Sequence, residues 1–328
     1  MFQRIVVPLD GGRFAEAALA PARELARAFS SRLLLVRAVP PHGFPAVTPG
    51  SLHETAAAAG LAHGANPDEH QIVVERADEA DAYLHSVTQH LRLAGYDADM
   101  TLALAAPGSA IAQAAAIEHA DLIVMATHLR WKVPATFAAS PMLDVLVRSR
   151  VPLLAWRVTG AEEPEGGPAV DDRPPLLARP AFPLLVPLDG TPLAEHALLA
   201  AEALARTFGL RVVLVCAVSE PQLEADASAY LRDIQAELKQ RGVHALPVTG
   251  VGDSLRVIET IWRREYGGLI VMASRGRLGP HGTIFGSLAA RVLAEAEASV
   301  LVVRPPEGNA AKAGSRADRV GTMNGPGM

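Results

Sequence analysis

The sequence contains one unit twice, and this duplication limits the possible fold more than any other feature. Residues 5–29, IVVPLDGGRFAEAALAPARELARAF, return without a gap as LLVPLDGTPLAEHALLAAEALARTF at 184–208. Residues 121–157 align in the same gapless way with residues 268–304. Because both ends of the unit recur, the chain of 328 residues is expected to form two similar domains, each large enough to bury a core.

The segments outside the repeat indicate where these domains end. Residues 1–158 and 183–305 are the expected domains, and residues 159–182 between them are rich in Pro, Gly and acidic side chains, which predicts a linker. Residues 306–328 hold little to bury, which predicts a disordered tail. An insertion at 41–70 in the first copy predicts a long loop or lid with one short helix.

Short apolar runs alternate with segments of helical period in each copy, as is typical of a parallel sheet covered by helices on both faces. The right-handed crossover rule then predicts an α/β fold with two tandem doubly wound five-stranded parallel sheets, Rossmann-like and of the adenine nucleotide-binding type. Each sheet is expected to have a switch point between its first and fourth strands. The expected strands are 3–9, 32–39, 98–105, 121–127 and 151–158 in the first copy, and 183–188, 211–218, 243–250, 268–273 and 299–304 in the second.

Composition and charge exclude several kinds of partner. The net charge of -5 comes without a long basic run, so nucleic acid is not an expected partner. No apolar stretch approaches the roughly 18 residues of a membrane helix, so we expect no membrane association and a cytoplasmic location. The single cysteine, Cys216, lies in the apolar run VVLVCAV and is interpreted as a buried strand residue.

Four histidines of the insertion invite a metal hypothesis, but their spacing argues against it. His42, His53, His63 and His70 match no close ligand pattern, and no cysteine or acidic cluster accompanies them. We therefore expect no metal site among them.

Two loops at the switch point of the second copy carry the candidate chemistry. Asp189 ends the first strand in PLDGT, where its carboxylate can accept hydrogen bonds from ribose hydroxyls or simply cap the next helix. The loop after the fourth strand, SRGRLGPHGTIFGS, places Gly276, Gly279 and Gly286 before a helix that is expected to begin near Ser287. Glycine backbone and a helix N-terminus can surround phosphate oxygens with N–H donors; a flexible turn with an ordinary N-cap is the other interpretation.

The combination of VPLDG, LIVMASRG, G-x2-G-x6-G-S and the final strand ASVLVVRP resembles the universal stress protein family. The resemblance covers nearly the whole chain twice, except for the linker, the insertion and the tail. The family spacing is G-x2-G-x9-G-[ST], so this loop is shorter after Gly279.

The resemblance implies a function and a role for each residue that matches the motif. Asp189 would contact the ribose, and Ala217 and Val218, at the end of the second strand, would border the adenine. The phosphates of ATP, often with a divalent cation such as Mg²⁺, would be held by Gly276, Gly279, Gly286 and Ser287. The family pairs its last strands across a dimer interface, which here implies an intramolecular pseudodimer of the two copies and leaves a further homodimer open.

The first copy departs from this motif in the gapless alignment. Gly276 is replaced by Leu129, Gly279 by Lys132 and Gly286 by Ala139, and only Ser287 keeps a serine, Ser140. Side chains occupy the space that a phosphate would need. The sequence therefore predicts weak nucleotide binding, or none, in the first domain.

The leading hypothesis is a regulatory, ATP-binding stress-response protein that acts on an unidentified protein partner. A structural pseudodimer or interaction module without nucleotide is the alternative, and an enzyme such as a slow ATP hydrolase ranks third. No G-x4-G-K-[ST] loop and no G-x-S-x-G elbow occurs, so we name no catalytic residue.

Overall fold

The computed structural model describes residues 1–40, 67–127, 140–158, 177, 182–274 and 288–305. The elements of the first half are β1 (Arg4–Pro8), α1 (Arg13–Glu16), α2 (Leu19–Phe29), β2 (Arg32–Ala38), α4 (Pro67–Leu93), β3 (Ala98–Ala103), α5 (Pro107–Ile117), β4 (Leu122–Thr127), α6 (Pro141–Arg148) and β5 (Leu153–Arg157). The elements of the second half are β6 (Leu184–Pro187), α7 (Pro192–Glu195), α8 (Ala197–Phe208), β7 (Val212–Val218), η2 (Pro221–Leu223), α9 (Glu224–Gln240), β8 (Ala245–Val251), α10 (Ser254–Arg264), β9 (Leu269–Ala273), α11 (Leu288–Glu295) and β10 (Ser299–Val303).

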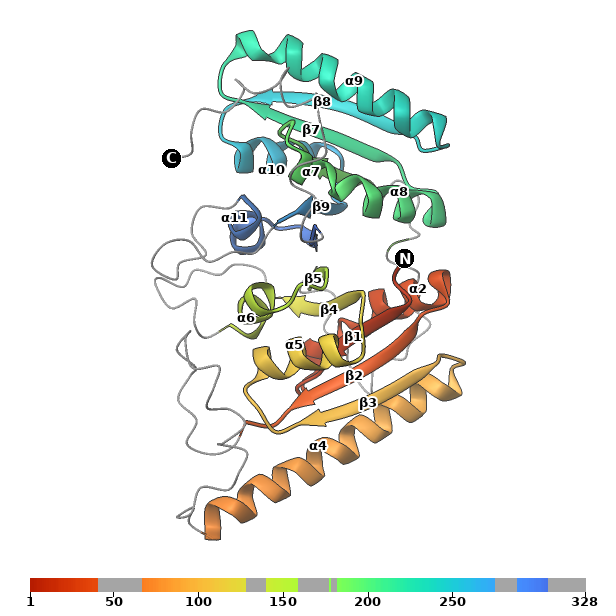
Figure 1. The fold of residues 1–328 in the computed structure, drawn as a ribbon, viewed down its shortest axis with the longest axis vertical. Helices are drawn as coiled ribbons and strands as arrows, with labels where there is room; N and C mark the ends of the chain where they lie inside the picture. The colour runs from red at the N-terminus through yellow and green to blue at the C-terminus, as the bar shows by residue number, and fades with distance from the viewer. Residues whose placement is uncertain (41–66, 128–139, 159–176, 178–181, 275–287, 306–328) are drawn as a thin grey trace.

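All of these strands belong to one sheet, in the order β3-β2-β1-β4-β5-β10-β9-β6-β7-β8. Within each half the neighbouring strands are parallel, and the first strand lies between the second and the fourth. The predicted doubly wound fold with its switch point is therefore confirmed for both halves. Figure 1 shows the two halves one above the other, with α4 beside β3 at one end of the sheet and α9 beside β8 at the other.

Three details differ from the sequence-based expectations. The helical period of residues 192–208 predicts a single helix, but the structure divides it into α7 and α8 at His196. The long helix α4 begins at Pro67, so the last residues of the insertion at 41–70 are helical and do not form a loop. Residue 177 of the expected linker is a core residue: the Leu177 side chain is 1% exposed, and its backbone N–H donates to Glu24 Oε2 at 2.8 Å.

Alternating burial along the strands creates an apolar core on each face of the sheet. One core packs the sheet against α2, α4, α8 and α9, and the other packs it against α5, α6, α10 and α11. Both cores contain residues from the two halves. The rings of Phe29 and Phe208, which occupy equivalent places in the repeat, contact each other edge to face with centroids 6.2 Å apart. The halves therefore share apolar packing on both faces of the sheet.

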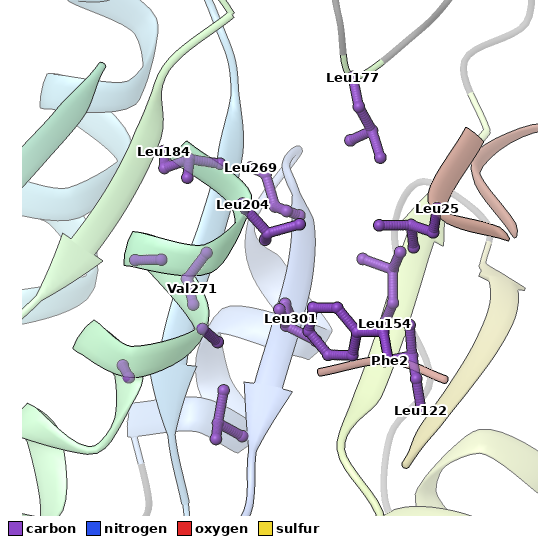
Figure 2. Packing of buried hydrophobic residues seen from close by; sticks show 14 of the residues in the cluster. Phe2, Leu25, Leu122, Leu154, Leu177, Leu184, Leu204, Leu269, Val271 and Leu301 are labelled. Carbon is purple, nitrogen blue, oxygen red and sulfur yellow. The ribbon is translucent and has the colours of Figure 1, made fainter. Parts of the chain in front are cut away.

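The two final strands, β5 and β10, join the halves by antiparallel pairing. Leu154 lies opposite Leu301, and each side chain is 2% exposed. Figure 2 shows Leu301 beside Leu154 and Phe2 of the first half. This is the intramolecular pairing of final strands that the family resemblance implied, and it leaves neither of these strands as a free edge.

An arginine after or at the end of each final strand reaches across this seam. Arg157 Nη2 donates to the carbonyl oxygens of Leu293 at 3.0 Å and Ala296 at 2.6 Å, at the C-terminal end of α11. Arg304, the equivalent residue of the second half, donates to the carbonyl oxygen of Leu146 in α6. Helix C-termini leave carbonyls without intrahelical partners and carry partial negative charge. The two guanidinium groups therefore cap one helix of the opposite half each.

Candidate functional site

The candidate site lies at the carboxyl ends of β6 and β9, where the topology of the second half changes direction. The turn after β6 is described, but the loop after β9 is not. The predicted phosphate ligands Gly276, Gly279, Gly286 and Ser287 lie outside the described residues. The geometry of this site is thus defined on its β6, β7 and α11 sides.

Asp189 stabilises the turn between β6 and α7. Gly190 has a φ of 80°, and Asp189 Oδ1 accepts hydrogen bonds from the Thr191 backbone N–H at 2.9 Å and the Thr191 hydroxyl at 2.6 Å. Thr191, and not Asp189, caps α7, because its hydroxyl accepts from the Ala194 N–H at 3.3 Å. The Asp189 side chain is exposed, and within the described part of the chain no residue other than Thr191 donates a hydrogen bond to it. Its other carboxylate oxygen can therefore accept a hydrogen bond from a ligand.

The first half forms the same turn at Asp10. Gly11 has a φ of 87°, and Asp10 Oδ1 accepts from the Gly12 N–H at 2.7 Å. Each aspartate therefore has a structural role in shaping its turn. The turn by itself does not distinguish the two halves.

Ala217 and Val218 end β7 beside this turn. Pro187 of β6 pairs with Val215 of β7. Asp189 and Ala217 each follow this pair by two residues, so they lie at the ends of neighbouring strands. The Ala217 side chain is half-buried, whereas that of Val218 is 1% exposed and belongs to the core under α8 and α9. Ala217 can thus offer its side chain to a ligand, whereas Val218 can offer only its backbone.

A tyrosine and a glutamate link two helices in each half, and sequence reasoning missed this pair. Tyr230 of α9 donates its hydroxyl to Glu195 Oε1 at 3.0 Å, and Tyr83 of α4 donates to Glu16 Oε1 at 2.7 Å. Burial, and then the carboxylate of Glu195, raise the pKa of Tyr230, so its phenol stays a neutral donor. The signal was available, because Glu16 and Glu195 are equivalent residues of the first repeated segment.

The residue near the end of the second strand of each half, beside the turn, differs between the halves. Pro8 pairs with Val36, and Pro187 pairs with Val215, so the residues that follow, Arg37 and Cys216, are equivalent. The Arg37 guanidinium lies 5.1 Å from the centroid of the Tyr83 ring. Cys216 is 1% exposed, as the sequence predicted for a buried strand cysteine.

Burial makes Cys216 a poor nucleophile. It raises the pKa of the thiol to about 11, and the nearby Asp189 carboxylate contributes to the rise. Because a free thiol titrates near about 8.5, the neutral thiol stabilises the fold below that pH, and this stabilisation is lost as the pH rises toward about 11.

We expect iodoacetamide to alkylate Cys216 at about pH 8 at least about 100-fold more slowly in the folded protein than in the urea-unfolded protein. The reason is that burial both shields the sulfur and suppresses the thiolate. Mass spectrometry of the alkylated fraction over time measures both rates. Equal rates in the two states would show that the thiol is accessible and ionised.

An ion pair holds the beginning of α11 against α10. Arg291 Nη1 lies 2.9 Å from Asp253 Oδ2, and its Nη2 lies 3.1 Å from Oδ1, while Asp253 also caps α10 through the Arg256 N–H. The hydrogen bond from Arg291 lowers the pKa of Asp253. This bidentate contact fixes the helix that follows the undescribed glycine loop.

Ser140, the first-half counterpart of Ser287, is an ordinary helix cap. Its hydroxyl accepts from the Leu143 N–H at 3.5 Å, and the residue is 8% exposed. Its predicted neighbours Leu129, Lys132 and Ala139 lie outside the described residues. The capping interpretation therefore holds for Ser140, while Ser287 is undescribed.

Neither a metal cluster nor a membrane helix is found in the described part of the chain. Among those residues, no three or more His, Cys, Asp or Glu side chains gather closely enough to hold a metal ion. No described helix combines the length and the apolar character that crossing a membrane requires. Within the described residues, the candidate site consists of the turn at Asp189, the end of β7 and the start of α11.

The fold and this site define a two-domain α/β protein with paired Rossmann-like halves. The sequence matches the Universal stress protein family over residues 1–157 and 182–304, and the chain belongs to this family. A comparison with curated proteins found no match.

Solved structures show the same fold over nearly the whole chain. A universal stress protein from Archaeoglobus fulgidus DSM 4304 is 17% identical with a TM-score of 0.67, and the match covers 93% of this chain and 97% of that chain. A functionally unknown protein from Pseudomonas aeruginosa PAO1 is 18% identical with a TM-score of 0.56, over 98% of this chain and 95% of that chain.

One similar structure contains an adenine nucleotide. It is a universal stress protein in complex with cAMP, 20% identical with a TM-score of 0.33, and the match covers 38% of this chain and 96% of that chain. The bound cAMP is a property of that protein.

Proposed function

We propose that the chain is a regulatory stress protein that binds one ATP, with Mg²⁺ as its counter-ion, in the second half. The observation that supports this most directly is the exposed Asp189 carboxylate at the switch point, where doubly wound proteins bind their ligands. Its turn already holds one oxygen through Thr191, so the other is fixed in position before a ligand arrives.

In this proposal Asp189 accepts a hydrogen bond from a ribose hydroxyl, and Ala217 and the backbone of Val218 border the adenine. The backbone N–H groups of Gly276, Gly279 and Gly286 and the hydroxyl of Ser287 bind the phosphates. Asp253 and Arg291 are positioning residues, because they hold the start of α11 that the loop leads into. The proposed location is the cytoplasm, and the proposed readout is an interaction with another protein.

The experiment compares two aspartates that make the same turn. We expect Asp189→Asn to weaken ATP binding about 10- to 100-fold, because a hydrogen bond to a carboxylate contributes about 1.5–3 kcal/mol. Asp10→Asn is the matched control: it alters the equivalent turn of the first half, and we expect unchanged affinity. Calorimetric titration of both variants and the wild type measures the effect.

The loop is tested by two further substitutions, Gly279→Lys and Gly286→Leu. Each puts a side chain where the proposed phosphate contact needs bare backbone, so each is expected to weaken ATP binding at least about tenfold. Mass spectrometry of the gently purified protein for a bound nucleotide gives an independent check. Equal affinity in the wild type and all three second-half variants would reject the nucleotide site.

The alternative is a structural pseudodimer that binds no nucleotide, and the extensive contact between the halves supports it. The halves share two cores, antiparallel final strands and reciprocal arginine caps, so joining them has structural value without any ligand. This alternative would be supported if the purified protein carries no nucleotide and added ATP does not bind to it. Slow ATP hydrolysis ranks below both, because the Asp189 carboxylate of the described site is engaged with Thr191 and is assigned to the ribose in this proposal.

A further inference from the structure

Arg37 occupies the space directly against the turn that carries Asp10. Its Nη1 and Nη2 atoms each lie 3.0 Å from the point that a Cβ atom on Gly11 would take. The guanidinium group therefore packs on the bare backbone of this glycine. On its other side it lies over the ring of Tyr83, at 5.1 Å from the centroid, in a cation–π arrangement.

The second half repeats four residues around this turn but not the arginine. Asp189, Gly190 and the Glu195–Tyr230 pair repeat Asp10, Gly11 and the Glu16–Tyr83 pair. The aspartate, the positive-φ glycine, the glutamate and the tyrosine are thus all retained in both halves. At the equivalent strand position stands Cys216, whose side chain is short, uncharged and buried. Among the described neighbours of the turn, Arg37 is thus exchanged for Cys216, and within the turn itself Gly12 is exchanged for Thr191.

This exchange changes what can approach the aspartate. A ligand at the switch point must reach the turn after the first strand, and in the first half the guanidinium group already lies against that turn. To displace it, a ligand would have to break the packing on Gly11 and the contact with Tyr83.

We propose that Arg37 closes the crevice of the first half to nucleosides and that Cys216 leaves the equivalent crevice of the second half open. This inference rests on the proposed nucleotide function and names the residue that restricts it to one half. It concerns the nucleoside end of the ligand and is independent of the glycine loops. Adenosine, which has no phosphates, is therefore the appropriate probe.

The test counts adenosine sites by calorimetric titration of the full chain in reducing buffer. The wild type is expected to bind one adenosine per chain. Arg37→Cys, which copies the second half into the first, is expected to bind two. Cys216→Arg, which copies the first half into the second, is expected to weaken the existing site at least about tenfold. Cys216→Ala is the matched control and is expected to keep that site unchanged.

The outcomes separate this inference from the proposed function. One site in both the wild type and Arg37→Cys overturns the inference and leaves the nucleotide function intact. No site in the wild type but one in Arg37→Cys overturns the function for the second half and supports the closing role of Arg37. No site in either protein overturns both. If Cys216→Arg fails to fold, as judged by its thermal unfolding, the Arg37→Cys titration decides.

Discussion

Replacing Leu301 by Asp is expected to lower the free energy of unfolding by at least about 4 kcal/mol, because it puts a carboxylate into the seam between the halves. Leu301 is 2% exposed and lies opposite Leu154 in the antiparallel pair of β10 and β5. Figure 2 shows the apolar side chains Leu154 and Phe2 beside it, across the seam. The described core cluster that contains Leu301 is built of hydrophobic residues, so a carboxylate there loses its hydration.

Urea unfolding followed by circular dichroism measures this change. Leu199→Asp is the matched control, since Leu199 is 62% exposed on α8 and the same substitution there should change stability by less than about 0.5 kcal/mol. A separate early transition in Leu301→Asp would mean that the seam opens before the halves unfold. A loss below about 1 kcal/mol would contradict the close packing of the seam.

Replacing Arg157 by Met is expected to lower the free energy of unfolding by about 3 kcal/mol. The guanidinium donates to the carbonyl oxygens of Leu293 and Ala296, and hydrogen bonds from a charged donor contribute about 1.5–3 kcal/mol each. Methionine fills a similar apolar volume but leaves these carbonyls at the end of α11 without their donor. Part of the free energy gained from these hydrogen bonds offsets the cost of burying the cation. Burial accordingly lowers the pKa of Arg157.

Arg291→Met is the matched control for this second prediction. Arg291 also belongs to an interaction at α11, but its side chain is 44% exposed and its partner Asp253 is 45% exposed. Its removal should therefore cost no more than about 1 kcal/mol. The loss of stability in Arg157→Lys should lie between the losses in Arg291→Met and Arg157→Met, because a single ammonium lacks the planar fork of the guanidinium. Equal stability of Arg157→Met and wild type would show that the cap contributes nothing.

The repeat and the apolar periodicity predicted the fold because each signal is local. Strands such as β7 and β9 are continuous apolar runs, as buried parallel strands must be, and the predicted strands agree with the observed ones to within a few residues. The structure of the insertion at 41–70 was harder to predict. Its weak periodicity concealed the start of α4 at Pro67, since a helix that is polar on most of its surface has little pattern.

The candidate site was predictable only in part. Asp189 was identified from its place at a strand end, but the sequence left open whether it caps α7, and the structure shows that Thr191 does so. The tyrosine–glutamate pairs were missed because they join helices that are far apart in the chain. Arg37 was missed because its sequence position marks it only as a charged residue within an apolar strand.

By itself, the sequence determined that the chain has two related α/β halves, that both first strands end in an aspartate turn, and that only the second half has a glycine-rich loop. These properties depend on residues that are close together in the chain or identical in the two copies. The tertiary structure decided that the halves share one sheet through β5 and β10, that Leu177 belongs to the core, and that Arg37 lies on the Gly11 turn. Such contacts depend on which surfaces meet after the helices and strands have formed, and side-chain packing at that distance leaves no periodic signal in the sequence.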